Sequence, residues 1–183
     1  YKRQVLTWKE KSLKLRMTTD YPEHGKVVIK LEETSKEPLT INLRRPVWAA
    51  GDVAIRINGS KQKVESVPGS FISLHRKWKK NDVIELILPM PLYTVSMPDN
   101  VDRRAVFYGP TILAGTFGTE KRKMGDIPVF VSEEKSLTNY IKKISDTSVS
   151  FVTTLPGGPD NVKMLPFYKV ADENQTVYWD VYS

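Results

Sequence analysis

The stretch Val53-Ala-Ile-Arg-Ile57, followed at once by Asn58-Gly59, decides the fold class of this chain. Apolar and polar residues alternate in it, which is the period-two pattern of a half-buried strand. Asn and Gly both tolerate the positive φ that a type I′ turn requires, so the pair predicts a tight hairpin. We therefore expect an antiparallel sheet at this point of the chain.

The same alternation recurs on both sides of the hairpin, and short segments rich in Gly, Pro, Asn and Asp separate the alternating stretches. No comparable stretch before residue 130 shows strong helical periodicity. Together these features predict an all-β fold, an antiparallel β-sandwich of jelly-roll-like type. The further predicted strands are Gln4–Trp8, Leu13–Thr18, Lys26–Glu32, Leu39–Leu43, Phe71–His75, Val83–Leu88 and Arg104–Tyr108.

The pattern loosens after Gly109-Pro110, where we expect a smaller C-terminal β-rich part containing one short helix. Ser136–Ile144 is the predicted helix, with Ser136 as its N-cap. We expect a β-sandwich domain at residues 1–115 and a smaller β-rich subdomain at residues 116–183. The last strand can belong to the second part or return to the first sandwich. Strands are predicted there at Val149–Thr153, Val162–Val170 and Gln175–Tyr182.

Composition excludes several kinds of site. The 183 residues include no cysteine, which rules out disulfides, thiolate nucleophiles and Cys-ligated zinc. The net charge of +7 comes from cations spread along alternating stretches, where outward sheet positions are normally charged. The basic cluster Arg76-Lys77-Trp78-Lys79-Lys80 is interpreted as a turn with a tryptophan in the core. Because the cations are spread out in this way, we expect no nucleic-acid partner. No apolar run reaches the roughly 18 residues of a membrane span, so we expect no membrane partner either.

No catalytic residue, metal ligand or cofactor site is predicted. The only histidines, His24 and His75, have no nucleophile motif beside them, and the sequence contains no phosphate-binding or dinucleotide fingerprint. Asp99, Asn100 and Asp102 form the one cluster suited to calcium, and we interpret them as a polar turn with calcium binding left open.

Aromatic side chains offer the remaining candidate chemistry. The chain has four tryptophans and eight tyrosines, and flat aromatic faces with polar neighbours are the usual platform for sugars. Trp48 and Trp78 are the candidate carbohydrate-binding residues. Packing in the core, or contact with a neighbouring domain, is the alternative interpretation of both.

A series of landmarks resembles a known family. In order they are Leu43-Arg-Arg-Pro-Val-Trp-Ala49, Ile57-Asn-Gly59, Pro68-Gly-Ser-Phe-Ile-Ser-Leu-His-Arg-Lys-Trp78, Asn81-Asp-Val-Ile-Glu-Leu-Ile-Leu-Pro-Met90 and Arg104-Ala-Val-Phe-Tyr-Gly-Pro110. This order is similar to that of the C-terminal β-sandwich region of glycoside hydrolase family 127, the β-L-arabinofuranosidase-like proteins.

The resemblance implies that catalysis belongs to an upstream (α/α)6 barrel of the same polypeptide, whose site uses cysteines, glutamate and zinc. This chain contains no cysteine, so no catalytic or metal-binding position carries over. The resemblance also implies a periplasmic or extracellular bacterial protein that acts on plant or host glycans, with an oligosaccharide as a further possible partner.

Three hypotheses follow. The first is a non-catalytic accessory region that supports the barrel, and the second is an independent carbohydrate-binding module. The third is a small glycosidase, which would require a cleft with two carboxyl groups about 5 to 9 Å apart. An exposed aromatic pair would favour the second, whereas fully buried indoles would count against it.

Overall fold

The computed structural model describes residues 2–120, 129–131, 136–154 and 161–182. It confirms the prediction of an all-β sandwich built from antiparallel sheets. The chain divides into two compact units, residues 1–91 and 92–183. Each unit is described by itself.

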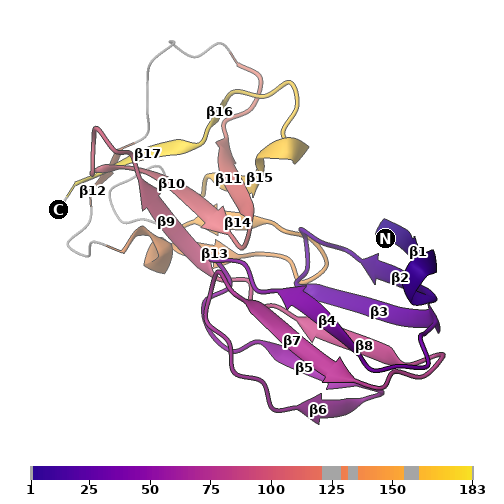
Figure 1. Cartoon of the computed structure of the whole chain (residues 1–183). Coiled ribbons are helices and arrows are strands. Elements are labelled where there is room, and N and C mark those ends of the chain that lie inside the picture. Colours follow the sequence, from indigo (N-terminus) through magenta and orange to yellow (C-terminus); the bar gives the residue numbers. More distant parts are fainter. Residues whose placement is uncertain (1, 121–128, 132–135, 155–160, 183) are drawn as a thin grey trace. The chain divides into compact units, whose positions relative to one another are not determined.

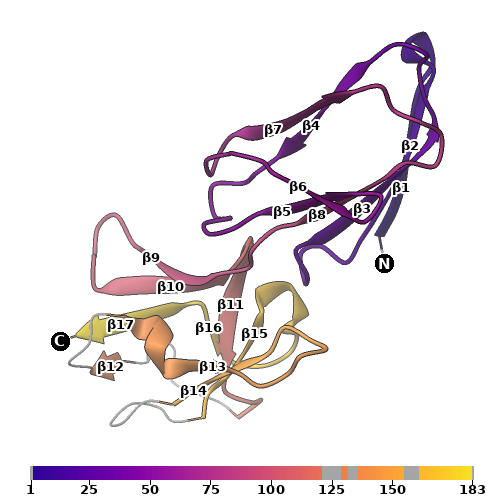
Figure 2. The same ribbon diagram turned by 90° about the horizontal axis from the view of Figure 1, so that it is seen from below.

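The first unit is a sandwich of two unequal sheets, seen as separate layers in Figure 2. The smaller sheet pairs β4 with β7, and the larger one has the strand order β1-β2-β3-β8-β5-β6. The 3-10 turn η1, Lys9–Lys11, joins β1 to β2. The strands are β1 Lys2–Trp8, β2 Leu13–Thr19, β3 Lys26–Glu33, β4 Leu39–Arg44, β5 Ala54–Ile57, β6 Ser60–Gln62, β7 Phe71–Arg76 and β8 Val83–Ile87.

Alternation along these strands places one set of apolar side chains between the two sheets. Leu31, Ile55 and Ile84 of the large sheet are fully buried and meet Ile72 and Leu74 of β7 in a single core. The large sheet has six strands and the small one has two, so the small sheet cannot cover the whole inner face. Strand β1 is exposed along its whole length, and it is left open together with the part of β2 beside it.

The predicted hairpin is present between β5 and β6. Asn58 and Gly59 have φ values of 51° and 80°, and Ile57 pairs directly with Ser60. The Asn58 side chain adds two bonds that the turn pattern does not require. Its Nδ2 donates to Asp82 Oδ1 and its Oδ1 accepts from Val83 N–H, both at 2.8 Å.

The second unit is a sheet with the order β12-β17-β10-β11-β15-β14-β13, to which β9 adds beside β10 and β16 beside β11 (Figure 1). All pairs are antiparallel except β12 with β17. The strands are β9 Leu92–Ser96, β10 Arg103–Tyr108, β11 Thr111–Thr116, β12 Val129–Val131, β13 Ile141–Lys143, β14 Phe151–Thr153, β15 Lys163–Pro166, β16 Gln175–Thr176 and β17 Tyr178–Tyr182.

Trp179 is the centre of the second core. It is fully buried with Val106, Leu113 and Met164. A Cβ atom at Gly115 would lie 2.5 Å from the Trp179 ring, so only glycine fits on β11 at this point.

The division between the units differs from the predicted one at residues 115 and 116. Strands β10 and β11 lie before the predicted boundary, but they pair with β17 and β15 from the end of the chain. The last strand pairs with Arg103–Tyr108, and both strands belong to the second unit, together with β11. The long-range hydrogen bonds, rather than the loosening of the pattern, set the division.

The predicted helix over Ser136–Ile144 is wrong in length. Only the 3-10 turn η2, Leu137–Tyr140, is helical, and the chain then enters β13. Ser136 makes no capping bond to the backbone, because its Oγ pairs with Thr138 Oγ1 at 2.9 Å. Leu137 and Ile141 are buried, whereas Ile144 is exposed. The predicted strand Val162–Val170 likewise ends at Pro166 and continues as the 3-10 turn η3, Phe167–Lys169.

Candidate functional surfaces

Arg45 organises the loop that carries Trp48. Its side chain is buried, and it makes five hydrogen bonds without a carboxylate partner. Nε and Nη2 donate to Ala49 O at 3.1 and 3.0 Å, and Nη2 also donates to Gly51 O at 2.7 Å. Nη1 donates to Ser66 O at 2.5 Å. The planar guanidinium thus fastens the loop at residues 46–51 to the loop at residues 66–70.

Trp48 lies half-buried on the edge of the first core. Its ring stacks on Tyr21 with the centroids 6.3 Å apart and the planes 29° from parallel. Burial raises the pKa of the Tyr21 hydroxyl above its ordinary value. The Arg45 hydrogen bonds and the Tyr21 ring therefore hold Trp48 in place, and its part in sugar binding stays a prediction.

Trp78 is placed differently. Its side chain is 3% exposed, and its Nε1 donates to Leu39 O at 3.0 Å. The Arg76 guanidinium lies 5.2 Å from the centre of the ring. Both polar and apolar parts of this indole are occupied within the sandwich, so Trp78 offers no face to a sugar. The cluster around it is a turn with a buried tryptophan, in agreement with its interpretation from the sequence.

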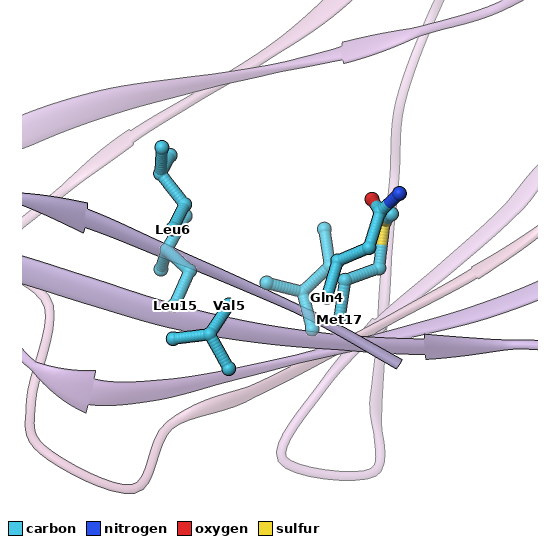
Figure 3. Close-up of a pocket in the computed structure, with 6 residues that line it drawn as sticks. Gln4, Val5, Leu6, Leu15 and Met17 are labelled. Carbon is cyan, nitrogen blue, oxygen red and sulfur yellow. The ribbon is translucent and has the colours of Figure 1, made fainter. Parts of the chain in front are cut away.

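A hollow of about 530 Å³ lies over β1 and β2 on the inner face of the large sheet. Direct cross-strand pairing sets Trp8 beside Leu13, Leu6 beside Leu15 and Gln4 beside Met17; the last two pairs are visible in Figure 3. Leu6 is 57% exposed and Trp8 48% exposed, although both stand on the face that is buried elsewhere in the sheet. A second hollow of about 370 Å³ continues it toward β4, and Met17 and Ile29 line both.

The sequence carried the signal for this surface, since Gln4-Val-Leu-Thr-Trp8 and Leu13-Lys-Leu-Arg-Met17 both alternate. The sequence pattern does not give the number of strands in the small sheet, and this number decides how much of the inner face of the large sheet is covered.

Three carboxyl groups of the first unit, those of Glu32, Asp82 and Glu85, have lowered pKa values. Arg16 hydrogen-bonds to Glu32 and, with Lys14, lowers the pKa of that carboxyl, and Lys26 does the same to Glu85. Burial acts to raise the pKa of Asp82, but hydrogen bonds from Asn58 and the Lys79 N–H outweigh it and leave the pKa lowered. A glycosidase acid needs the opposite shift.

The two histidines lie apart on the first unit. His24 is exposed in the turn before β3, and His75 is exposed on β7, where its Nδ1 is 2.8 Å from Thr40 Oγ1. Within the described parts of the chain no three His, Cys, Asp or Glu side chains gather as metal ligands.

Asp99, Asn100 and Asp102 lie in the turn between β9 and β10. The Asn100 Oδ1 accepts from the Asp102 N–H at 3.0 Å, and the Asn100 carbonyl accepts from Arg103 N–H at 3.1 Å. These bonds are those of a polar turn, as the sequence suggested. No helix in the described residues is long and apolar enough to span a membrane.

Comparison with known proteins agrees with the fold. Residues 1–90 match the family model described as the middle domain of β-L-arabinofuranosidase, GH127. A solved structure named glycoside hydrolase is 20% identical with a TM-score of 0.72, covering 99% of this chain and 34% of that one. A GH127 β-L-arabinofuranosidase from Geobacillus stearothermophilus T6 is 17% identical with a TM-score of 0.72, covering 98% and 32%. A GH127 β-arabinofuranosidase is 19% identical with a TM-score of 0.73, covering 98% and 33%. No functionally curated protein matches the sequence.

These matches confirm the resemblance to glycoside hydrolase family 127. Residues 1–90 match the model of the GH127 middle domain, and the whole chain shares the fold of the corresponding part of the solved structures. The chain spans about a third of the length of the solved structures that it matches. The match to a middle domain supports a glycoside hydrolase accessory domain.

Proposed function

We propose that this chain, with its GH127 middle domain, is the non-catalytic region on which an upstream helical (α/α)6 barrel of the same polypeptide packs. The observation that carries the proposal is the open apolar face of β1 and β2. A monomeric domain rarely leaves leucine and tryptophan side chains such as Leu6 and Trp8 together on one face in water. Such a face is expected where another domain covers it.

The barrel is the proposed occupant because the matched structures are about three times as long as this chain and the matched family model is that of a middle domain. The described carboxyl groups with shifted pKa values are all held in the ionised form, which also suits a region that leaves the chemistry to another domain. In this proposal the complete protein is a secreted, periplasmic or extracellular enzyme acting on plant or host glycans.

Surface variants of β1 test the packing. We would produce the upstream region and this chain as separate polypeptides and measure their association by titration calorimetry. Leu6→Asp should weaken association at least tenfold, since burying half of a leucine contributes about 1 kcal/mol and the penalty for burying an aspartate takes the loss beyond the roughly 1.4 kcal/mol of a tenfold change.

Thr7→Asp is the matched control, because Thr7 is the next residue on β1 and pairs with Lys14 on the opposite face. It should leave the affinity unchanged. Absence of association between the two folded parts, or equal effects of the two substitutions, would rule out this face as the docking surface.

A further inference from the structure

The outer face of the small sheet carries three cross-strand pairs in a row. Thr40 stands opposite His75, Asn42 opposite Ser73 and Arg44 opposite Phe71. Each pair is joined by its side chains: Thr40 Oγ1 lies 2.8 Å from His75 Nδ1, Ser73 Oγ donates to Asn42 Oδ1 at 2.8 Å, and the Arg44 guanidinium lies 5.2 Å from the Phe71 ring centre.

These contacts fix the side chains while leaving hydrogen-bonding groups free. His75 keeps Nε2, Asn42 keeps its amide nitrogen, and Arg44 keeps its N–H donors. Phe71 is 56% exposed. Alternate residues on a strand are about 6.8 Å apart, so three pairs extend over roughly 14 Å. The row is longer than one sugar ring and ends on an aromatic side chain.

A polar hollow of about 320 Å³ lies along the same strand. Ser73 and His75 belong to both the row and the hollow, and Gln62, Lys63 and Arg76 form most of its other polar lining. Among the described strands, β7 pairs only with β4, so its other edge is open toward this hollow. The row and the hollow are therefore one continuous surface.

The charge of this surface is positive. Lys63 and Arg76 line the hollow and Arg44 closes the row, whereas the lining contains no acidic side chain. The carboxylate of Asp82 interacts electrostatically with Arg76. Asp82 is buried, however, and its carboxylate accepts hydrogen bonds from Asn58 Nδ2 and the Lys79 N–H. Arg76 is held over Trp78, so its guanidinium is already positioned.

We propose that this surface, the outer face of β4 and β7 with the hollow at Lys63, binds an oligosaccharide that carries carboxylate groups, that is, a uronic-acid-containing glycan. Phe71 packs against the apolar face of one sugar, and Asn42, Ser73 and His75 exchange hydrogen bonds with hydroxyls. Lys63 and Arg76 pair with the carboxylates. This binding goes beyond the scaffold role and uses a different face from the one over β1 and β2.

Affinity electrophoresis of the intact 183-residue chain tests the proposal, with polygalacturonate as the acidic probe and dextran as the neutral one. Polygalacturonate should retard the chain and dextran should not. Lys63→Gln should weaken binding about tenfold, the effect of one lost charge-assisted hydrogen bond. Phe71→Ala should weaken it as well, and its exposed position leaves the fold intact.

Lys61→Gln is the matched control, since it removes the same charge two residues away on β6 and opposite Arg56, outside the hollow. It should change the retardation little. Equal losses for Lys61→Gln and Lys63→Gln would show attraction to the overall +7 charge and overturn the site. Equal retardation by dextran would overturn the acidic class of ligand, and no retardation by either probe would overturn binding, leaving the face to a protein partner.

Discussion

The Arg45 side chain alone joins two loops of the first unit through its hydrogen bonds. It is buried without an acid and is satisfied almost wholly by backbone carbonyls, so its charge is spread over Ala49, Gly51 and Ser66. The motif Arg44-Arg45-Pro46 gave no indication of which arginine is buried. The alternation of β4 supplies the answer only once Leu43 is known to face the core, because Arg45 then shares that side.

Arg45→Met should lower the free energy of unfolding by about 3 kcal/mol, because it leaves buried carbonyl groups without donors. Urea denaturation followed by tryptophan fluorescence measures this change. The neighbouring exposed Arg44→Met should cost less than about 1 kcal/mol, since it loses only the contact with Phe71. Similar losses of unfolding free energy in the two variants would show that the Arg45 guanidinium does not hold the two loops together.

Asp180 gives the second unit a dependence on pH. The hydrogen bonds from Arg103, at 2.8 and 3.0 Å, hold the pKa of this carboxyl below its ordinary value, and burial opposes them only in part. The folded pKa is thus lower than the unfolded one. The pair therefore stabilises the fold fully above about pH 4 and less as pH falls through the folded pKa.

We expect the thermal midpoint of the chain to fall as pH is lowered from about 5 to about 3. Asp180→Asn should reduce this decline and lower the midpoint at pH 7, whereas Asp146→Asn, at an exposed loop position, should do neither. Circular dichroism melts across this range provide the measurement. An unchanged pH profile in Asp180→Asn would mean that the ion pair with Arg103 contributes nothing.

At the scale of elements, local patterns predicted strands well and the helix poorly. Period-two alternation located the strands of the first unit to within a residue or two, but it missed β6, β9 and β11. Strand β6 is only Ser60–Gln62, and β11 contains Gly115, whose missing side chain makes room for Trp179. Ser136–Ile144 carried a helical spacing, yet β13 forms there because β14 offers a partner.

In the hairpin between β5 and β6, the contribution of the Asn58 side-chain hydrogen bonds can be separated from that of the turn conformation. Asn58→Gly keeps the positive φ but removes the amide that joins Asp82 to the turn, so it should cost about 1 to 2 kcal/mol. Gly59→Ala keeps the amide and strains the backbone, for about 1 kcal/mol. Denaturant midpoints of the two variants compare these effects. A neutral Asn58→Gly would show that only the turn conformation matters here.

At the scale of the whole molecule, sequence predicted two β-rich parts and the family, while pairing over long distances decided the division. Trp179 and Asp180 lie almost at the end of the chain, and they complete a core and an ion pair with residues near position 105. The exposure of the candidate surfaces is likewise set by packing between distant parts of the chain. Trp78 is buried in the first core and Trp48 is half-buried at its edge, and the open face at β1 depends on how few strands oppose it.

The most direct test of the non-catalytic role is turnover of arylarabinofuranosides by this chain alone, beside a longer polypeptide that includes the proposed upstream barrel. We expect no turnover by the folded chain and clear turnover by the longer polypeptide. Hydrolysis by the chain alone, removed by a substitution within it, would contradict the account and place catalysis in the β-sandwich region itself.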